Sequence, residues 1–303
     1  MPLRPRTLVC LMAISPIFAA QPAPMKAIQG ELDRLYPALD ALYLDFHEHP
    51  ELSGKEVKTA AKMADQMRKA GFDVTTGVVG LLRNGKGPTL LLRTELDALP
   101  VQEKTGLPYA SQEPGVMHAC GHDLHMTALT GAAAVLSRLK DRWRGTLVLV
   151  AQPAEETAGG ARPMIADGLF TRFPKPDFAL ALHDSGTVPA GQIAWVEGYV
   201  CANVDSVDIT LFGRGGHGAA PHTTVDPIVM AARTILALQT LISREKDPME
   251  PGVITVGSIH AGTKHNIIPD EALPHLELLP GMLASCEGQS SGSRCQVASS
   301  ARP

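Results

Sequence analysis

Cysteine is scarce in this chain, and neither sign of charge dominates. Its 303 residues include five cysteines, and 27 lysines and arginines stand against 31 aspartates and glutamates, for a net charge of -4. An odd and sparse set of cysteines does not favour a disulfide framework. A weakly acidic chain without a basic patch gives no reason to expect a nucleic-acid or anionic-membrane partner. We therefore expect neither nucleic acid nor a membrane among its partners.

The N-terminus lacks an apolar run long enough to span a membrane. Its apolar stretch, Thr7 to Ala20, is interrupted by Ser15 and Pro16 and is too short for a membrane helix. It follows Arg4 and Arg6 and ends in small residues, which is typical of a secretory signal peptide. We predict a signal peptide over residues 1–20 and hence a periplasmic or secreted protein.

The length and the patterning of the chain predict two domains. A chain of 303 residues exceeds the usual size of one domain. Up to residue 198, helical patterns at Met25–Phe46, Val57–Ala70 and Leu124–Lys140 alternate with short strand-like runs. This alternation indicates a layered α/β domain over residues 21–198.

A smaller α+β domain is predicted over residues 199–280. Val204–Phe212 alternates as a half-buried strand, Pro227–Ser243 is an amphipathic helix, and Val253–Ile259 is a further strand. Residues 281–303 have no apolar periodicity, so we expect a disordered tail there.

Three apolar runs end in side chains that bind metals or move protons. Such short runs read as strands of a buried sheet: Thr89–Arg93 leads to Glu95 and Asp97, Thr146–Gln152 to Glu155 and Glu156, and Phe178–Leu182 to His183. In open α/β sheets, ligands bind outside the carboxyl ends of the strands. The sequence therefore predicts one rim that carries four carboxylates and an imidazole, with Cys120 and His122 in the segment between the first two strands.

Thiolate, imidazole and carboxylate form a mixed ligand set that suits zinc and that manganese or nickel tolerates. The pair Cys120 and His122 is weak evidence alone, because a buried structural cysteine beside a surface histidine is commoner. Its combination with Glu155, Glu156 and His183 indicates a metal site. One of two adjacent glutamates can bind metal while the other takes a proton from water that the metal activates, which suggests amide or peptide hydrolysis.

Four segments carry a resemblance to a known family. They are Leu92–Pro100 (LRTELDALP), Met117–Met126 (MHACGHDLHM), Gln152–Gly160 (QPAEETAGG) and Gly213–His222 (GRGGHGAAPH). In order and spacing, from about Leu32 to Ala272, the chain resembles the amidohydrolase branch of the co-catalytic zinc aminoacylase and carboxypeptidase family. That branch includes hippurate hydrolase and the indole-acetyl-amino-acid hydrolases.

The resemblance implies an α/β fold in which a layered catalytic domain has a mixed sheet with helices on both faces. It also implies a smaller α+β lid domain through which the family forms homodimers. The implied activity is that of a metal-dependent amidohydrolase that cleaves N-acyl amino acids or small peptides, with two divalent ions, zinc or manganese, as cofactors.

The resemblance also implies roles for single residues. Cys120, His122, Glu156 and His183 match metal ligands, and Glu155 matches the general base. Asp97 matches an acidic residue that orients a ligand, whereas Glu95 stands where this branch more often has Asp. In the lid, His217 matches a histidine that reaches the partner subunit's substrate and stabilises the tetrahedral oxyanion, and Asn266 matches a residue that contacts substrate.

The family pattern stops near Ala272. In the family the chain then returns to the catalytic domain and supplies a last metal-ligand histidine, a role that neither His265 nor His275 fits. We therefore expect both domains to be incomplete at the C-terminus. The alternative to an active enzyme is a catalytically impaired, truncated member or metal-binding fragment, which holds one ion if the site is incomplete.

A dinucleotide-binding oxidoreductase is a remote alternative. Gly213–Gly218 fits the pattern G-x-G-x-x-G between a strand and a helix. However, the preceding strand alternates, and no acidic residue ends a second strand about twenty residues later, as ribose recognition requires.

Overall fold

A computed structural model of the chain describes residues 23–75, 78–195, 197, 205–250 and 252–279. The predicted signal peptide, the predicted tail and the predicted domain boundary at residue 198 lie outside these residues. The chain divides into two compact units, Met1–Pro189 and Ala190–Pro303. Within the described ranges, no helix combines the length and the apolar character that a membrane crossing requires.

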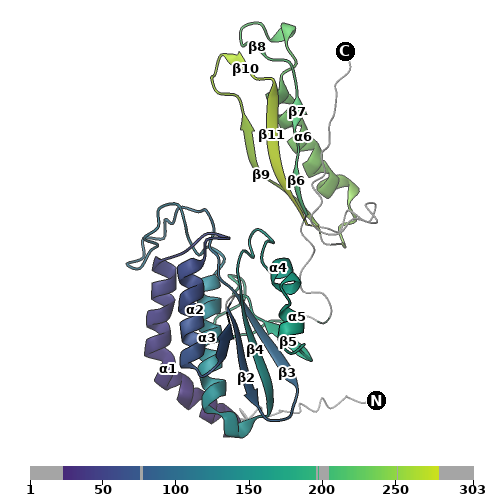
Figure 1. The fold of residues 1–303 in the computed structure, drawn as a ribbon. Coiled ribbons are helices and arrows are strands. Elements are labelled where there is room, and N and C mark those ends of the chain that lie inside the picture. The colour runs from purple at the N-terminus through teal and green to yellow at the C-terminus, as the bar shows by residue number, and fades with distance from the viewer. Residues whose placement is uncertain (1–22, 76–77, 196, 198–204, 251, 280–303) are drawn as a thin grey trace, which may run out of the picture. The chain divides into compact units, whose positions relative to one another are not determined.

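The first unit is built on a five-stranded mixed sheet (Figure 1). In spatial order its strands are β1 (Asp73–Thr75), β2 (Val79–Asn84), β4 (Gly145–Gln152), β3 (Thr89–Glu95) and β5 (Phe178–Ala181). Strand β3 runs parallel to β4 and β5, whereas β2 runs antiparallel to β1 and β4. The predicted mixed sheet is thus confirmed.

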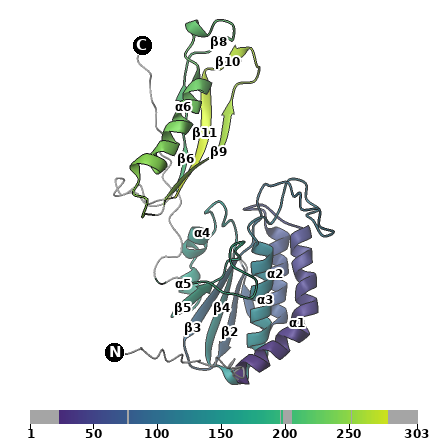
Figure 2. The same cartoon turned by 180° about the vertical axis from the view of Figure 1, so that it is seen from behind.

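Helices cover both faces of this sheet, as Figures 1 and 2 show from opposite sides. One face carries α1 (Ala23–Glu48), α2 (Val57–Lys69) and α3 (His122–Arg138, followed by a 3-10 turn at Lys140–Arg142), and the other carries α4 (Ala161–Ala166) and α5 (Leu169–Arg172). Strand β4 shows how the layers form, because successive side chains of a strand point to opposite faces. Leu147 and Leu149 join the core under α1 to α3, whereas Val148 and Val150 pack with Leu169 of α5.

Strand β5 differs from the expectation of a buried strand. It lies at the edge of the sheet and pairs only with β3 among the described strands. All four residues of β5 are exposed. Phe178 and Leu180 are 64% and 57% exposed, and Leu182, directly after the strand, is 65% exposed. The strand itself was predicted correctly, but its burial was not, because burial requires a neighbour beyond β5 that the described residues do not provide.

The second unit is a four-stranded antiparallel sheet covered by one helix. The central strand β11 (Glu271–Leu279) pairs with β9 (Val253–Ala261) on one side and with β6 (Asp205–Asp208) and β7 (Leu211–Phe212) on the other. Helix α6 (Pro227–Thr240), which continues into a π-helical turn at Leu241–Glu245, packs Ala231 against Leu211 and Ala272. Asp226 caps α6 by accepting hydrogen bonds from two backbone N–H groups of its first turn.

The strand predicted over Val204–Phe212 is interrupted between β6 and β7. At this point the N–H of Ile209 donates to the carbonyl oxygen of Pro274 in β11. Proline has no N–H to return the hydrogen bond, so the ladder breaks there. A separate ribbon of β8 (Gly216–His217) and β10 (Ile267–Ile268), with a 3-10 turn at Pro221–Thr223, completes the unit.

Candidate metal centre

The carboxyl ends of β3, β4 and β5 meet at one edge of the sheet. Because β3 is parallel to both neighbours, the register pairs Glu95 with Gln152 and Arg93 with Ala181. The chain segments that leave this edge carry the site residues predicted from the strand ends, namely Asp97, Glu155, Glu156 and His183.

The loop that enters α3 adds Cys120 and His122 to this edge. Gly121, between them, caps α3 with a φ of 77°, in the left-handed region that favours glycine. A Cβ at Gly121 would lie 2.4 Å from Oδ1 of Asp184. The loop therefore approaches the segment after β5 more closely than a residue with a side chain would allow.

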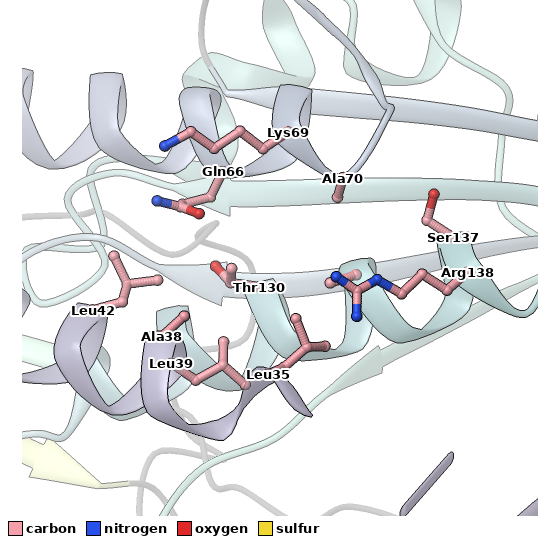
Figure 3. Close-up of a pocket in the computed structure, with 11 residues that line it drawn as sticks. Leu35, Ala38, Leu39, Leu42, Gln66, Lys69, Ala70, Thr130, Ser137 and Arg138 are labelled. Carbon is pink, nitrogen blue, oxygen red and sulfur yellow. The ribbon is translucent and has the colours of Figure 1, made fainter. Parts of the chain in front are cut away.

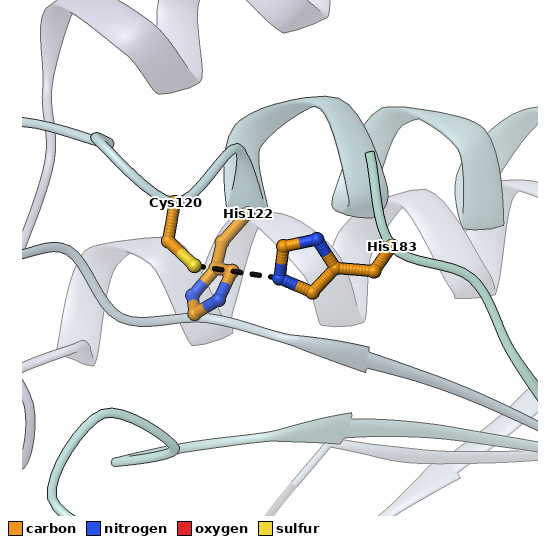
Figure 4. A group of neighbouring side chains, drawn as sticks. All are labelled: Cys120, His122 and His183. Carbon is orange, nitrogen blue, oxygen red and sulfur yellow. Dashed lines mark hydrogen bonds between the residues drawn. The ribbon is translucent and has the colours of Figure 1, made fainter. Parts of the chain in front are cut away.

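Cys120, His122 and His183 form the first group of possible ligands (Figure 4). The Sγ of Cys120 lies 3.4 Å from Nε2 of His183, and Sγ and one nitrogen of each ring all lie within 4.8 Å of one another. Tetrahedral zinc with bonds of about 2.0–2.3 Å places its ligand atoms roughly 3.5 Å apart. The three side chains are thus close to the arrangement that one such ion needs.

His122, Glu155 and Glu156 form a second group, which shares His122 with the first. Nε2 of His122 lies 3.8 Å from Oε2 of Glu155 and 3.9 Å from Oε1 of Glu156. Within the described part of the chain, neither this Nε2 nor Oε1 of Glu156 has a hydrogen-bond partner, although both are buried. Since buried polar atoms cost free energy unless they are paired, two facing electron donors fit a cation between them.

Hydrogen bonding at the opposite side of the ring leaves the His122 Nε2 lone pair available. Nδ1 of His122 lies 2.7 Å from the backbone oxygen of Asp97, which can only accept, so Nδ1 carries the proton. The Asp97 carboxylate accepts from the Ser53 hydroxyl at 2.6 Å and from the Glu156 N–H at 2.9 Å. Asp97 therefore ties together the segments that carry His122 and Glu156.

This hydrogen bonding keeps Asp97 ionised. Burial alone would raise the pKa of Asp97, but hydrogen bonds from His122, Ser53 and the backbone after β4 lower that pKa well below its usual range. A buried carboxylate next to a metal-ligating imidazole is the common means of orienting such a ligand.

A constrained loop presents the two glutamates. Ala154 has a φ of 49°, which is uncommon for a residue other than glycine, and its N–H donates to the buried carboxylate of Glu56 at 2.7 Å. A Cβ at Gly160 would lie 1.7 Å from the carbonyl oxygen of Pro153. The loop is therefore held to one path, which fixes where its side chains emerge.

The rim is electrostatically suited to a cation. Burial, followed by the nearby carboxylates of Glu156 and Glu155, raises the pKa of the Cys120 thiol to about 12. Burial also raises the pKa of Glu156, opposed by His122 and reinforced by Glu155. A divalent ion would supply the missing positive charge and deprotonate a coordinating thiol.

Two residues that the sequence reasoning missed also lie at this edge. His125 contacts Glu95, with Nδ1 3.1 Å from Oε2, and its Nε2 lies 3.0 Å from Oδ1 of Asp184. The sequence could have indicated both residues: His125 follows His122 by three residues and so lies on the same face of the helix, and Asp184 directly follows His183.

The structure brings the two predicted lid residues together in the second unit. His217 of β8 pairs in register with Ile267 of β10, and the N–H of Gly218 donates to the backbone oxygen of Asn266 at 2.9 Å. The exposed His217 ring accepts the N–H of Ala219 at 3.1 Å. Oδ1 of Asn266 is buried without a hydrogen-bond partner in the described ranges.

The glycine-rich segment does not form the phosphate-binding loop of a dinucleotide site. A Cβ at Gly213 would lie 2.2 Å from the Val225 oxygen, and one at Gly215 would lie 2.6 Å from the Ile268 oxygen. These glycines allow backbone segments to pack on one another, and the segment leads into β8 rather than directly into a helix. The geometry thus opposes the dinucleotide-binding alternative.

A cavity of about 220 Å³ between α1, α2 and α3 is a different kind of site (Figure 3). It is lined by Leu35, Ala38, Leu39, Leu42, Gln66, Lys69, Ala70, Thr130, Ala134, Ser137 and Arg138. Its lining contains no histidine, cysteine or carboxylate, so it offers none of the side chains on which metal chemistry depends.

The chain is similar in sequence and fold to proteins of a known family. The model of peptidase family M20/M25/M40 matches residues 91–271. Thermostable carboxypeptidase 1 of Saccharolobus solfataricus is 43% identical over 235 residues, 75% of this chain and 59% of the relative. Hippurate hydrolase of Campylobacter jejuni is 41% identical over 251 residues, 81% of this chain and 63% of the relative.

A solved structure, a dinuclear metal-binding peptidase of the M20 family from Bacillus subtilis, superposes with a TM-score of 0.60 at 31% identity, and the match covers 81% of this chain and 64% of that one. The chain spans 59% and 63% of the lengths of the two curated relatives. The match over more than half of its residues shows that the chain belongs to peptidase family M20/M25/M40.

Proposed function

We propose that the chain is a metal-dependent amidohydrolase that cleaves the amide bond of N-acyl amino acids or small peptides. The observation that carries this proposal is a pair of buried atoms with lone pairs, Nε2 of His122 and Oε1 of Glu156, which have no hydrogen-bond partner among the described residues. They face each other beside Cys120 and His183. The relatives support the substrate class, because they include a hippurate hydrolase and a carboxypeptidase.

Cys120, His122, Glu156 and His183 would hold two divalent ions, zinc or manganese, and the single lone pair of His122 Nε2 would serve one of them. A thiolate among the ligands favours zinc, and the carboxylates suit manganese as well. When bound, the ions would acidify water and polarise the substrate carbonyl. The Cys120 thiol would release its proton on binding, whereas His122 and His183 would keep the proton on Nδ1.

Glu155 is the proposed general base. Its side chain is 37% exposed, against 19% for Glu156, so it reaches solvent as well as the site. A carboxylate placed in this way can take a proton from the attacking water and pass it to the leaving amine. Glu156 is more deeply buried, and its Oε1 has no hydrogen-bond partner within the described ranges, so it is better suited to hold metal.

The second unit is proposed to act as the lid. The exposed ring of His217 can donate a hydrogen bond to a developing oxyanion, and Asn266 beside it can contact substrate. We further propose that the chain forms a homodimer through this unit and, from the pattern of residues 1–20, that it is periplasmic or secreted.

Hydrolysis of hippurate and of N-acetyl amino acids by the purified full chain, loaded with zinc or manganese, tests this function. We expect turnover that Glu155→Gln lowers by about 10²–10⁴-fold, while metal content is retained. Glu113→Gln, on the exposed segment before the Cys120 loop, is the matched control. A metal-loaded wild-type chain without turnover would refute the active enzyme and favour the catalytically impaired family member.

A further inference from the structure

We propose that Asp184 and His125 are positioning residues that hold the imidazole of His183 in its metal-binding orientation. The inference rests on the proposed function in one respect, namely that His183 binds metal. It concerns two residues to which the proposed function gives no role.

Strand β5 cannot hold His183 by packing. All four residues of the strand are exposed, and the His183 side chain itself is 56% exposed. A metal ligand needs a locked rotamer, which normally comes from packing or from outer hydrogen bonds. At this edge strand, hydrogen bonds must therefore lock the rotamer of His183.

Asp184 supplies acceptors that set the His183 tautomer. Nδ1 of His183 lies 2.8 Å from the backbone oxygen of Asp184 and 3.2 Å from its Oδ1. Both oxygens accept, so Nδ1 carries the proton and the lone pair of Nε2 points toward Cys120, 3.4 Å away.

His125 fixes Asp184 in turn. The N–H of Asp184 donates to Nε2 of His125 at 2.9 Å. Oδ1 of Asp184 lies 3.0 Å from the same nitrogen, which can bond to only one of these two groups at a time. The rings of His125 and His183 meet edge to face, with centroids 4.6 Å apart and an interplanar angle of 69°. His125 therefore contacts the His183 ring and also both the backbone and the side chain of the residue that orients it.

Glu95 anchors this network to the sheet. Its Oε2 lies 3.1 Å from Nδ1 of His125, and its Oε1 pairs with Arg93, whose Nε donates to Gln152 at 3.0 Å. Glu95 is almost completely buried, so it offers a fixed point from which the contacts lead outward to the exposed edge.

The Cys120 loop is shaped to the same carboxylate. A Cβ at Gly121 would lie 2.4 Å from Oδ1 and 2.6 Å from Cγ of Asp184. The Asp184 carboxylate thus lies against the loop that carries Cys120 as well as against His183.

Titration of the full chain with Co²⁺ tests the proposal, because a thiolate ligand gives a near-ultraviolet charge-transfer band and the visible bands report the ligand geometry. We expect Asp184→Ala to weaken Co²⁺ binding by about 10–100-fold and to alter the visible bands. Asp184→Asn keeps an acceptor oxygen but loses the charge, so it should recover only part of the loss and bind about three- to tenfold more weakly than wild type. Asp141→Asn, a 76% exposed side chain at the other end of β4, is the matched control and should bind as wild type does.

A folded Asp184→Ala variant with wild-type affinity and an unchanged spectrum overturns the inference while the proposed metal centre stands. If Asp184→Ala does not fold by circular dichroism, the isosteric Asp184→Asn decides, and an unchanged affinity and spectrum there overturn the inference. A wild-type chain that shows no thiolate band with Co²⁺ refutes the metal centre itself, and the inference with it.

Discussion

Asp97→Asn is the substitution that probes the metal centre without removing a proposed ligand. Asp97 is 1% exposed, and its Oδ2 accepts hydrogen bonds from Ser53 and from the Glu156 N–H. An asparagine can place its amide oxygen at that position and keep both bonds. Its NH₂ group then replaces Oδ1, which lies 3.5 Å from the proton-bearing Nδ1 of His122.

The expected losses in metal affinity and stability follow from the interactions that Asp97→Asn removes. A negative charge beside the His122 ring is replaced by a donor that faces another donor. Loss of such an outer partner of a ligating histidine costs about 10–100-fold in metal affinity, or about 1.4–2.7 kcal/mol. The buried NH₂ group also lacks an acceptor, which should lower the free energy of unfolding by about 1–3 kcal/mol.

The assay is a competition titration of Zn²⁺ against a chelator of known affinity, with urea unfolding of the metal-free chain in parallel. Asp141→Asn provides the control for a change of charge at an exposed site. A folded Asp97→Asn variant that binds Zn²⁺ as tightly as wild type would refute the reasoning that Asp97 orients His122.

Three further predictions concern backbone strain and protonation. Gly121→Ala should lower the free energy of unfolding and weaken metal binding, because its Cβ would meet the Asp184 carboxylate and its φ of 77° is strained for alanine. Gly106→Ala is the control: its φ is 72° but the space around it is open, so it should show only the backbone strain of about 1–2 kcal/mol. The pKa of Cys120 is raised to about 12, so a metal ion must displace the thiol proton when it binds, and the metal affinity should rise with pH. Cys120→Ser should reduce the slope of the logarithm of the metal affinity against pH by about one. Burial would lower the pKa of His47, but hydrogen bonds to Asp123 and a second carboxylate raise it above the unfolded value. The stabilisation is therefore present below about pH 6.5 and is lost as pH rises through the folded pKa, so urea unfolding should show a larger deficit for His47→Gln at pH 5.5 than at pH 9.

The fold was predictable from the sequence where the signal is local. Helix α2 begins at Val57 as predicted and ends one residue before the expected end, because apolar spacing and Gly71 mark its limits. Three strand ends were also predictable, since β-branched and Leu-rich runs bounded by polar residues need no knowledge of their neighbours. The parallel register then brings their carboxyl ends to one edge.

What the sequence did not predict depends on distant neighbours. The exposure of Phe178 on β5 depends on what lies beside the strand, and the break between β6 and β7 depends on a proline more than sixty residues later. The contacts of His125 with Glu95 and Asp184 depend on the reach of side chains from three separate elements. The spacing of residues along the chain does not predict such contacts between side chains of separate elements, although the position of His125, three residues after His122 on α3, indicated that it lies near the site.

X-ray absorption at the zinc edge of the zinc-loaded full chain tests the central claim, that Cys120 and its neighbours bind metal, most directly. We predict a sulfur scatterer at about 2.3 Å, on average about half a sulfur per zinc when two ions are bound, together with nitrogen and oxygen scatterers at about 2.0–2.1 Å. The sulfur signal should disappear in Cys120→Ser while the other four cysteines remain. A first shell of nitrogen and oxygen alone in the fully loaded wild-type chain would contradict the claim.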